Sequence, residues 1–129
     1  MLARNKKQKI EKYAFGHDEL TPLSNGTNDP FGGWGATLVD SLSTLLVMDL
    51  ETEFNAAMRL VHRINFKVND DVSVFESIIR YLGGLLSAYD LSERKYRPLM
   101  VQAEKLAIAL LPAFDTPSGL PAHYWNPAK

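Results

Sequence analysis

The stretch VFESIIRYLGGLLSAY, residues 74–89, places a charge pair inside an apolar helical pattern. Glu76 and Arg80 are four residues apart, with the acid nearer the N-terminus, so a helix presents both side chains on one face. A partly buried carboxylate of this kind is a candidate for proton transfer. The alternative is a helix cap with a surface ion pair, which is worth about 0.2–0.5 kcal/mol.

Two adjacent glycines, Gly83 and Gly84, share that second face of the helix. Each glycine inside a helix costs about 0.5–1 kcal/mol relative to alanine. A solvated face has no reason to carry two of them, whereas a face that packs closely on a neighbour or lines a cavity does. The glycines therefore favour a cavity-facing acid, and the residues alone point to no particular reaction.

The other polar candidates are less specific. Asp18 and Glu19, in GHDEL, are compatible with a helix cap or with a site, and Asp40 lies on the polar face of a predicted helix. The three histidines are far apart and show no metal-ligand spacing, so a structural or surface role is expected for each. The absence of cysteine excludes disulfides, thiolate catalysis and cysteine-based metal sites.

Composition indicates one globular domain, since the 129 residues are 46% hydrophobic and 22% charged. The formal net charge of −1 gives no indication of a nucleic-acid or anionic-membrane partner. The basic segment MLARNKKQKIEKY is interpreted as the solvated face of a helix over residues 3–15. It lacks the apolar stretch of a secretory signal, and no window of the chain is apolar enough for a membrane span.

Apolar periodicity predicts the elements that must position these groups. Helices are expected over residues 36–50 and 51–64, joined by a tight turn near Asp49 into an antiparallel hairpin. A third helix over residues 74–89 has Ser73 as its N-cap and Glu76 completing a capping box. Its predicted apolar stripe is Phe75, Ile78, Ile79, Leu82, Leu85, Leu86 and Tyr89.

A last helix is predicted from Pro98 to Leu111, and the proline-containing tail after it is expected to be loop or extended. The glycine-rich segment 16–35 is predicted to be a loop, and no segment shows convincing strand alternation. The fold class is therefore all-α, with successive helical hairpins.

Four stretches, YAFGHDELTPLS, DPFGGWGATLVDSLSTLLVMDL, VSVFESIIRYLGGLLSAYDLS and LLPAFDTPSGLP, resemble successive N-terminal motifs of glycoside hydrolase family 47. These are the class I α-1,2-mannosidases that trim mannose from N-linked glycans. The resemblance implies an (α/α)7 barrel of helical hairpins, of which residues 1–129 would form the N-terminal part of a truncated catalytic domain. It also implies an inverting reaction that requires calcium.

The resemblance implies roles for single residues. Glu76 matches a family catalytic acid that protonates the leaving sugar oxygen, and Arg80 matches the arginine that contacts substrate and orients that acid. Asp18, Glu19 and Asp40 match motif positions without an assigned step. The threonine motif that holds calcium in the complete domain is absent, so no metal ligand is expected in this chain.

The implied partner is a high-mannose N-glycan or glycoprotein in the endoplasmic reticulum or Golgi, although the chain carries no signal or anchor. The chain alone is expected to be inactive, and helix faces around Leu42 and Ile79 are expected to be exposed for want of neighbours. The alternative is a catalytically inactive, mannosidase-like glycan-binding protein of glycoprotein quality control. A helical interaction module is disfavoured by four motifs in family order.

Overall fold

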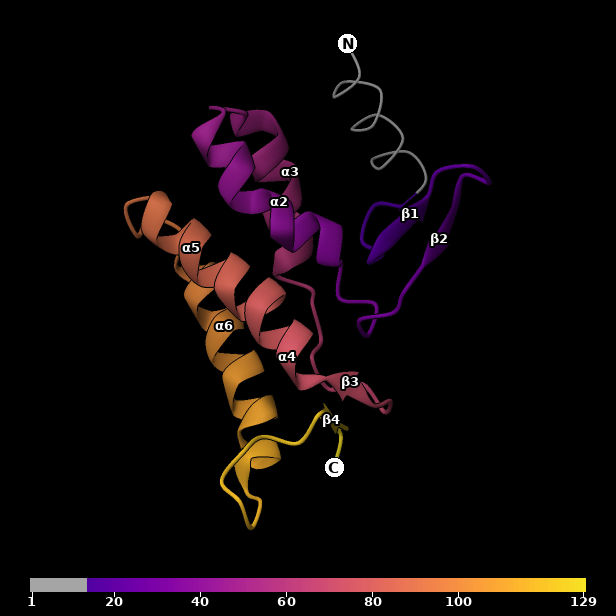
Figure 1. Cartoon of the computed structure of the whole chain (residues 1–129). Helices are drawn as coiled ribbons and strands as arrows, with labels where there is room; N and C mark the ends of the chain where they lie inside the picture. The colour runs from indigo at the N-terminus through magenta and orange to yellow at the C-terminus, as the bar shows by residue number, and fades with distance from the viewer. Residues whose placement is uncertain (1–13) are drawn as a thin grey trace.

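The fold consists mainly of two helical hairpins (Figure 1). The predicted all-α class is therefore confirmed. The structure is a computed structural model that describes residues 14–129. The predicted helix over residues 3–15 lies almost wholly outside the described residues, and its last two positions, Ala14 and Phe15, are not helical.

The first hairpin consists of α2 (Ala36–Val47) and α3 (Glu51–Val61), as the apolar periodicity predicts. Asp49 has a positive φ of 58°. The Asp49 amide donates to the carbonyl of Leu46 and the Leu50 amide to that of Leu45. These two bonds form a Schellman turn, which satisfies the last carbonyls of α2 and sends the chain directly into α3.

The second hairpin pairs a long helix in three segments with α6 (Arg97–Leu110). The segments are α4 (Val74–Glu76), the π-helical turn η1 (Ser77–Leu82) and α5 (Gly83–Leu91). This helix also ends in a Schellman turn, in which the Arg94 amide donates to the carbonyl of Tyr89 and the Glu93 amide to that of Asp90. A 3₁₀ turn, η2 (Leu111–Phe114), contains Pro112 and ends α6.

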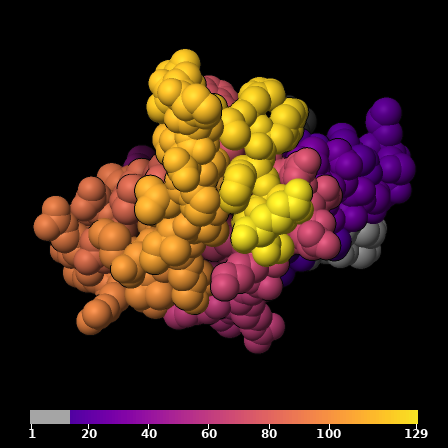
Figure 2. All heavy atoms as spheres, turned by 90° about the horizontal axis from the view of Figure 1, so that it is seen from below, coloured from indigo at the N-terminus to yellow at the C-terminus, as the bar shows by residue number. Residues whose placement is uncertain are grey.

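Two short antiparallel pairs of strands lie outside the helices, in segments where the sequence shows no convincing strand alternation. β1 (Glu19–Thr21) pairs with β2 (Gly26–Asn28) inside the glycine-rich segment, with Glu19 opposite Asn28. β3 (Val72–Ser73) pairs with β4 (Tyr124–Trp125), so the tail returns to the start of α4. Figure 2 shows this tail, in yellow, against the segment that precedes α4. Strands of two or three residues are too short to show period-two alternation.

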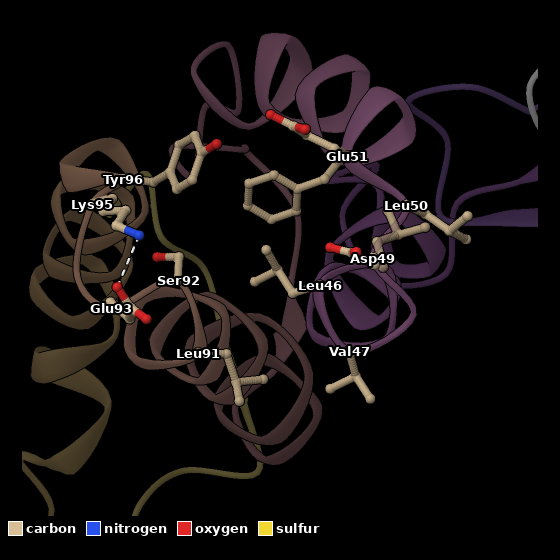
Figure 3. Close-up of a pocket in the computed structure, with 12 residues that line it drawn as sticks. Leu46, Val47, Asp49, Leu50, Glu51, Leu91, Ser92, Glu93, Lys95 and Tyr96 are labelled. Carbon is tan, nitrogen blue, oxygen red and sulfur yellow. Dashed lines mark ion pairs between the residues drawn. The ribbon is translucent and has the colours of Figure 1, made fainter.

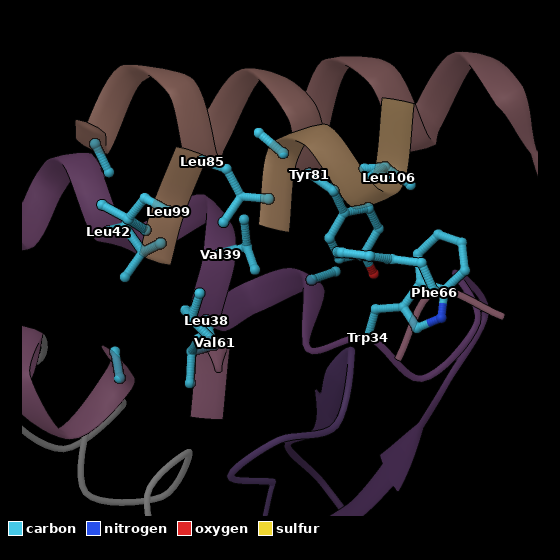
Figure 4. Close-up of a cluster of buried hydrophobic side chains, with 14 of the residues drawn as sticks. Trp34, Leu38, Val39, Leu42, Val61, Phe66, Tyr81, Leu85, Leu99 and Leu106 are labelled. Atoms are coloured by element: carbon cyan, nitrogen blue, oxygen red, sulfur yellow. The ribbon is translucent and has the colours of Figure 1, made fainter. Parts of the chain in front are cut away.

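The core lies between the two hairpins (Figure 4). Leu42 from α2, Leu85 from α5 and Leu99 from α6 are fully buried. Beside them Trp34 makes edge-to-face contacts with Phe66, at 5.1 Å between ring centroids, and with Tyr81, at 5.3 Å. These aromatic contacts join the glycine-rich segment to the second hairpin through Tyr81 and to the connection between the hairpins through Phe66.

The predicted apolar stripe of the third helix is partly wrong. The buried positions are Val74, Ser77, Tyr81, Leu85 and Ala88. Leu85 is therefore predicted correctly, and Ile78, Leu82 and Tyr89 are partly buried against the core. Phe75 and Ile79 are 62% and 51% exposed, and Leu86 is exposed as well. Tyr81 lies outside the predicted stripe, and its hydrogen bond to the buried Asp18 allows its hydroxyl inside the core.

The prediction of exposed apolar faces has a divided outcome. It is confirmed around Ile79, where Phe75 and Leu86 are also exposed, and it is wrong for Leu42, which is fully buried. Leu42 is covered because α3 and α6 both contribute side chains to the same core. The exposed face of the second hairpin therefore flanks the Glu76–Arg80 pair.

Candidate active site

Arg80 joins two carboxylates from different helices. Its Nε donates to Glu76 Oε2 at 2.6 Å, and its Nη1 donates to Asp40 Oδ2 at 3.0 Å. The first contact is the i, i+4 pair predicted from the sequence, and the second crosses from η1 to α2. Hydrogen bonds from the guanidinium to Glu76 first, and to Asp40 second, raise the pKa of Arg80.

The three side chains are partly exposed, since Glu76, Arg80 and Asp40 keep 29%, 37% and 38% of their accessible surface. A partly exposed ion pair is screened by water and contributes little to the free energy of folding. The expected cavity around Glu76 is thus not closed by the described residues. What the described residues supply is one wall, with a fixed carboxylate–guanidinium–carboxylate arrangement.

Ser73 fixes the start of the helix that carries Glu76. Its Oγ accepts from the Glu76 amide at 3.3 Å, which confirms the predicted N-cap. The second half of the predicted capping box is not formed, because the Glu76 carboxylate bonds to Arg80 instead of reaching back to the Ser73 amide. The Val74 amide donates to the His123 carbonyl at 3.1 Å, so the C-terminal tail also holds this helix start.

Gly84 brings the two helices of the site together. A Cβ at Gly84 would lie 3.0 Å from Val39 Cγ1 and 3.1 Å from the Val39 carbonyl oxygen. Val39 precedes Asp40, so this close approach places Asp40 within reach of Arg80. The predicted close packing is confirmed at Gly84, whereas a Cβ at Gly83 would meet only the Ile78 carbonyl oxygen, at 3.6 Å.

Phe31 covers the guanidinium of Arg80, with its ring centroid 4.9 Å from Arg80 Cζ, a distance typical of a cation–π contact. The Phe31 amide donates to Asp18 Oδ2 at 2.9 Å, and its carbonyl accepts from the Tyr81 hydroxyl at 3.3 Å. The glycine-rich segment thus reaches the site through a single aromatic side chain.

Asp18 is fully buried, and its carboxylate holds the backbone of the glycine-rich segment in place. Its carboxylate accepts from the amides of Phe31, Gly33 and Ala36 and from the Tyr81 hydroxyl, at 2.8–3.0 Å. Ala36 is the first residue of α2, so Asp18 caps that helix from a distant position in the chain. Burial first, and the charge of Asp18 second, raise the pKa of Tyr81, which keeps its hydroxyl a donor.

Glu19 lies away from the site, on β1, where it accepts from Asn28 Nδ2 at 3.3 Å. Asp29, the residue after β2, accepts from the Asp18 amide and pairs with His17 Nδ1, each at 2.8 Å. Partial desolvation raises the pKa of Asp29, but the bonds from Asp18 and His17 outweigh it and leave that pKa lowered. Of the predicted candidates, the structure brings together Glu76, Arg80 and Asp40, supports them through Asp18, and leaves Glu19 apart.

The described residues do not fit a calcium site. Within residues 14–129 no group of three or more His, Asp or Glu side chains is arranged to hold a metal ion. Calcium prefers six to eight oxygen ligands, whereas both carboxylate oxygens of Asp18 and one of Asp40 already accept from protein donors. A calcium ion of the complete domain would therefore need ligands outside these residues.

A pocket of about 480 Å³ lies at the C-terminal ends of α2 and α5, between the two Schellman turns and away from Glu76 (Figure 3). Its apolar lining includes Leu46, Phe54 and Tyr96, and Glu93, another lining residue, pairs with Lys95 at 2.8 Å. None of Glu76, Arg80 and Asp40 lines it. It is therefore separate from the candidate site.

Three residues of the site were missed in the sequence. Phe31 and Tyr81 carry no spacing signal, because each depends on a contact with a segment far along the chain. Asp29 likewise accepts from the amide of Asp18, 11 positions earlier in the chain, so local turn chemistry gives no signal for this contact.

Comparison with known proteins identifies the family. A profile of glycosyl hydrolase family 47 matches residues 5–129. The chain is 46% identical over 126 residues to a probable mannosyl-oligosaccharide alpha-1,2-mannosidase 1B of Aspergillus flavus, covering 89% of this chain and 25% of that protein. It is 48% identical over 117 residues to mannosyl-oligosaccharide 1,2-alpha-mannosidase MNS1 of Arabidopsis thaliana, covering 90% and 20%.

The fold is likewise similar to that of a solved structure. The alpha-1,2-mannosidase from Trichoderma reesei superposes with a TM-score of 0.88 at 39% identity, over 94% of this chain and 28% of that one. The helical hairpins therefore match part of an (α/α)7 barrel, and the chain spans about a quarter of the length of the relatives it matches. With its profile match, its identities and its superposition in agreement, the chain belongs to glycosyl hydrolase family 47.

Proposed function

We propose that this chain supplies one wall of the active site of a mannosyl-oligosaccharide α-1,2-mannosidase, with Glu76 as the general acid. The observation that carries the proposal is the position of Glu76, whose backbone is fixed by Ser73 and whose carboxylate is bonded to Arg80 at 2.6 Å. The relatives named above as α-1,2-mannosidases support the substrate class, α-1,2-linked mannose in an oligosaccharide.

In the proposed reaction, Glu76 donates a proton to the glycosidic oxygen as the bond to the anomeric carbon breaks. A water molecule, deprotonated by a second carboxylate, attacks the anomeric carbon from the opposite face and inverts its configuration. Arg80 directs the Glu76 carboxyl and contacts the sugar. We assign the second carboxylate, and the oxygen ligands of calcium, to parts of the domain outside this chain.

The natural substrate in this proposal is a high-mannose N-glycan on a glycoprotein in the secretory pathway. Among the described residues, no helix is long and apolar enough to cross a membrane.

A hybrid enzyme tests the role of Glu76. Residues 14–129 replace the matched quarter of the Trichoderma reesei enzyme, and release of mannose from α-1,2-mannobiose is measured. Glu76→Gln should lower kcat by about 10²–10⁴-fold with a much smaller effect on KM, since general acid catalysis contributes that range. The chain by itself should give no turnover.

The matched control is Asp90→Asn. Asp90 lies on the same long helix as Glu76, and its carboxylate forms an exposed ion pair with Arg94. It should leave kcat unchanged. A Glu76→Gln hybrid as active as the parent would show that Glu76 is not the acid. A parent hybrid that melts cooperatively and binds the glycan without cleaving it would instead favour the inactive glycan-binding protein.

A further inference from the structure

Arg80 is held on three sides by groups from three segments of the chain. Glu76 takes its Nε at 2.6 Å from the same helix, Asp40 takes its Nη1 at 3.0 Å from α2, and the Phe31 ring lies 4.9 Å from its Cζ. A free arginine side chain has many rotamers, so three simultaneous contacts select one orientation of the guanidinium plane.

We propose that Asp40 is a positioning residue for the general acid, acting through Arg80. Asp40 anchors the outer edge of the guanidinium, so that the Nε edge remains directed at Glu76, while Phe31 prevents the plane from tilting. This inference rests on the proposed function of Glu76, and it assigns Asp40 no contact with the reacting atoms.

The anchoring depends on packing that is built into the fold. Gly84 lets α5 approach the backbone of α2 at Val39, and the next residue, Asp40, is thereby brought to Arg80. Phe31 is held from behind by Asp18, whose carboxylate accepts from the Phe31 amide. The partners of Arg80 are therefore fixed by buried contacts, although the Arg80 side chain itself is 37% exposed.

The first test observes Arg80 directly in the chain. In ¹⁵N NMR spectra the Arg80 Nε–H proton should exchange with water slowly, and Asp40→Asn should accelerate that exchange about tenfold or more. The control Asp90→Asn should not change it. A parent chain without a protected Arg80 Nε–H, or an Asp40→Asn variant with unchanged exchange, would overturn the inference.

The second test uses the hybrid enzyme and measures kcat and KM separately. Asp40→Asn should lower kcat by about tenfold with little change in KM, because Arg80 then loses the contact that fixes its guanidinium beside Glu76. Asp40→Glu should restore part of kcat. If Glu76→Gln is inactive while Asp40→Asn keeps the parent kcat, this inference fails alone. If Glu76→Gln retains full activity, the proposed function fails.

Discussion

Gly83 and Gly84 are adjacent in one helix, but the structure predicts opposite effects when each is replaced by alanine. Both have helical neighbours, so either substitution gains about 0.5–1 kcal/mol in the free energy of unfolding from helix propensity. At Gly83 a Cβ meets only a carbonyl oxygen at 3.6 Å, an ordinary contact. Gly83→Ala should therefore stabilise the protein by about that amount.

At Gly84 the new methyl would lie 3.0 Å from Val39 Cγ1 and 3.1 Å from the Val39 carbonyl oxygen. The backbone of α2 must then move away from α5, and overpacking of this kind costs about 1–3 kcal/mol. The propensity gain is common to both variants and cancels in their difference. Gly84→Ala should accordingly be less stable than Gly83→Ala by about 1–3 kcal/mol.

Equilibrium urea unfolding, followed by circular dichroism and by the fluorescence of Trp34 and Trp125, measures this difference. The slope of the unfolding free energy against urea should be the same in both variants, since the exposed surface is unchanged. Equal stabilisation by the two alanines would refute the close approach of α5 to α2. In the hybrid enzyme, Gly84→Ala should also weaken the Asp40–Arg80 contact and lower kcat, whereas Gly83→Ala should not.

Three further predictions concern the supports of the site. Asp18→Ala should lower the free energy of unfolding by about 3–5 kcal/mol, because it leaves buried donors unsatisfied; Glu19→Gln, in the same urea titration, should change it by less than about 0.5 kcal/mol. Ser73→Ala should cost about 1 kcal/mol through loss of the N-cap, and a change below about 0.3 kcal/mol would show that the cap contributes nothing. Because the pKa of Asp29 is lowered in the folded protein, the stability that its carboxylate contributes is complete above pH 3.8, the ordinary pKa, and is lost as the pH falls through the lowered pKa. The stability difference between Asp29→Asn and the parent should therefore shrink on acidification in that range. An unchanged difference would contradict the pairing of Asp29 with His17.

Local pattern alone determined much of this protein. The periodicity of apolar residues located α2, α3, the long helix and α6 to within a few residues, because a helix is specified by neighbours three and four positions apart. The Ser73 cap and the Glu76–Arg80 pair are local in the same sense, and both are confirmed. Ordered motifs identified the family, which the comparisons show independently.

Only the tertiary structure decided what surrounds that pair. Asp40 contacts Arg80 across 40 positions, and Tyr81 bonds to Asp18 across 63, and such distant partners leave no trace in local spacing. The same contacts explain why Tyr81 is buried while Phe75 is exposed, against the apolar pattern. The helical pattern determines which residues share a face, but the neighbouring segments determine which face is covered. Here the face that carries Tyr81 and Gly84 is covered, because Tyr81 bonds to the buried Asp18 carboxylate and Gly84 packs against Val39.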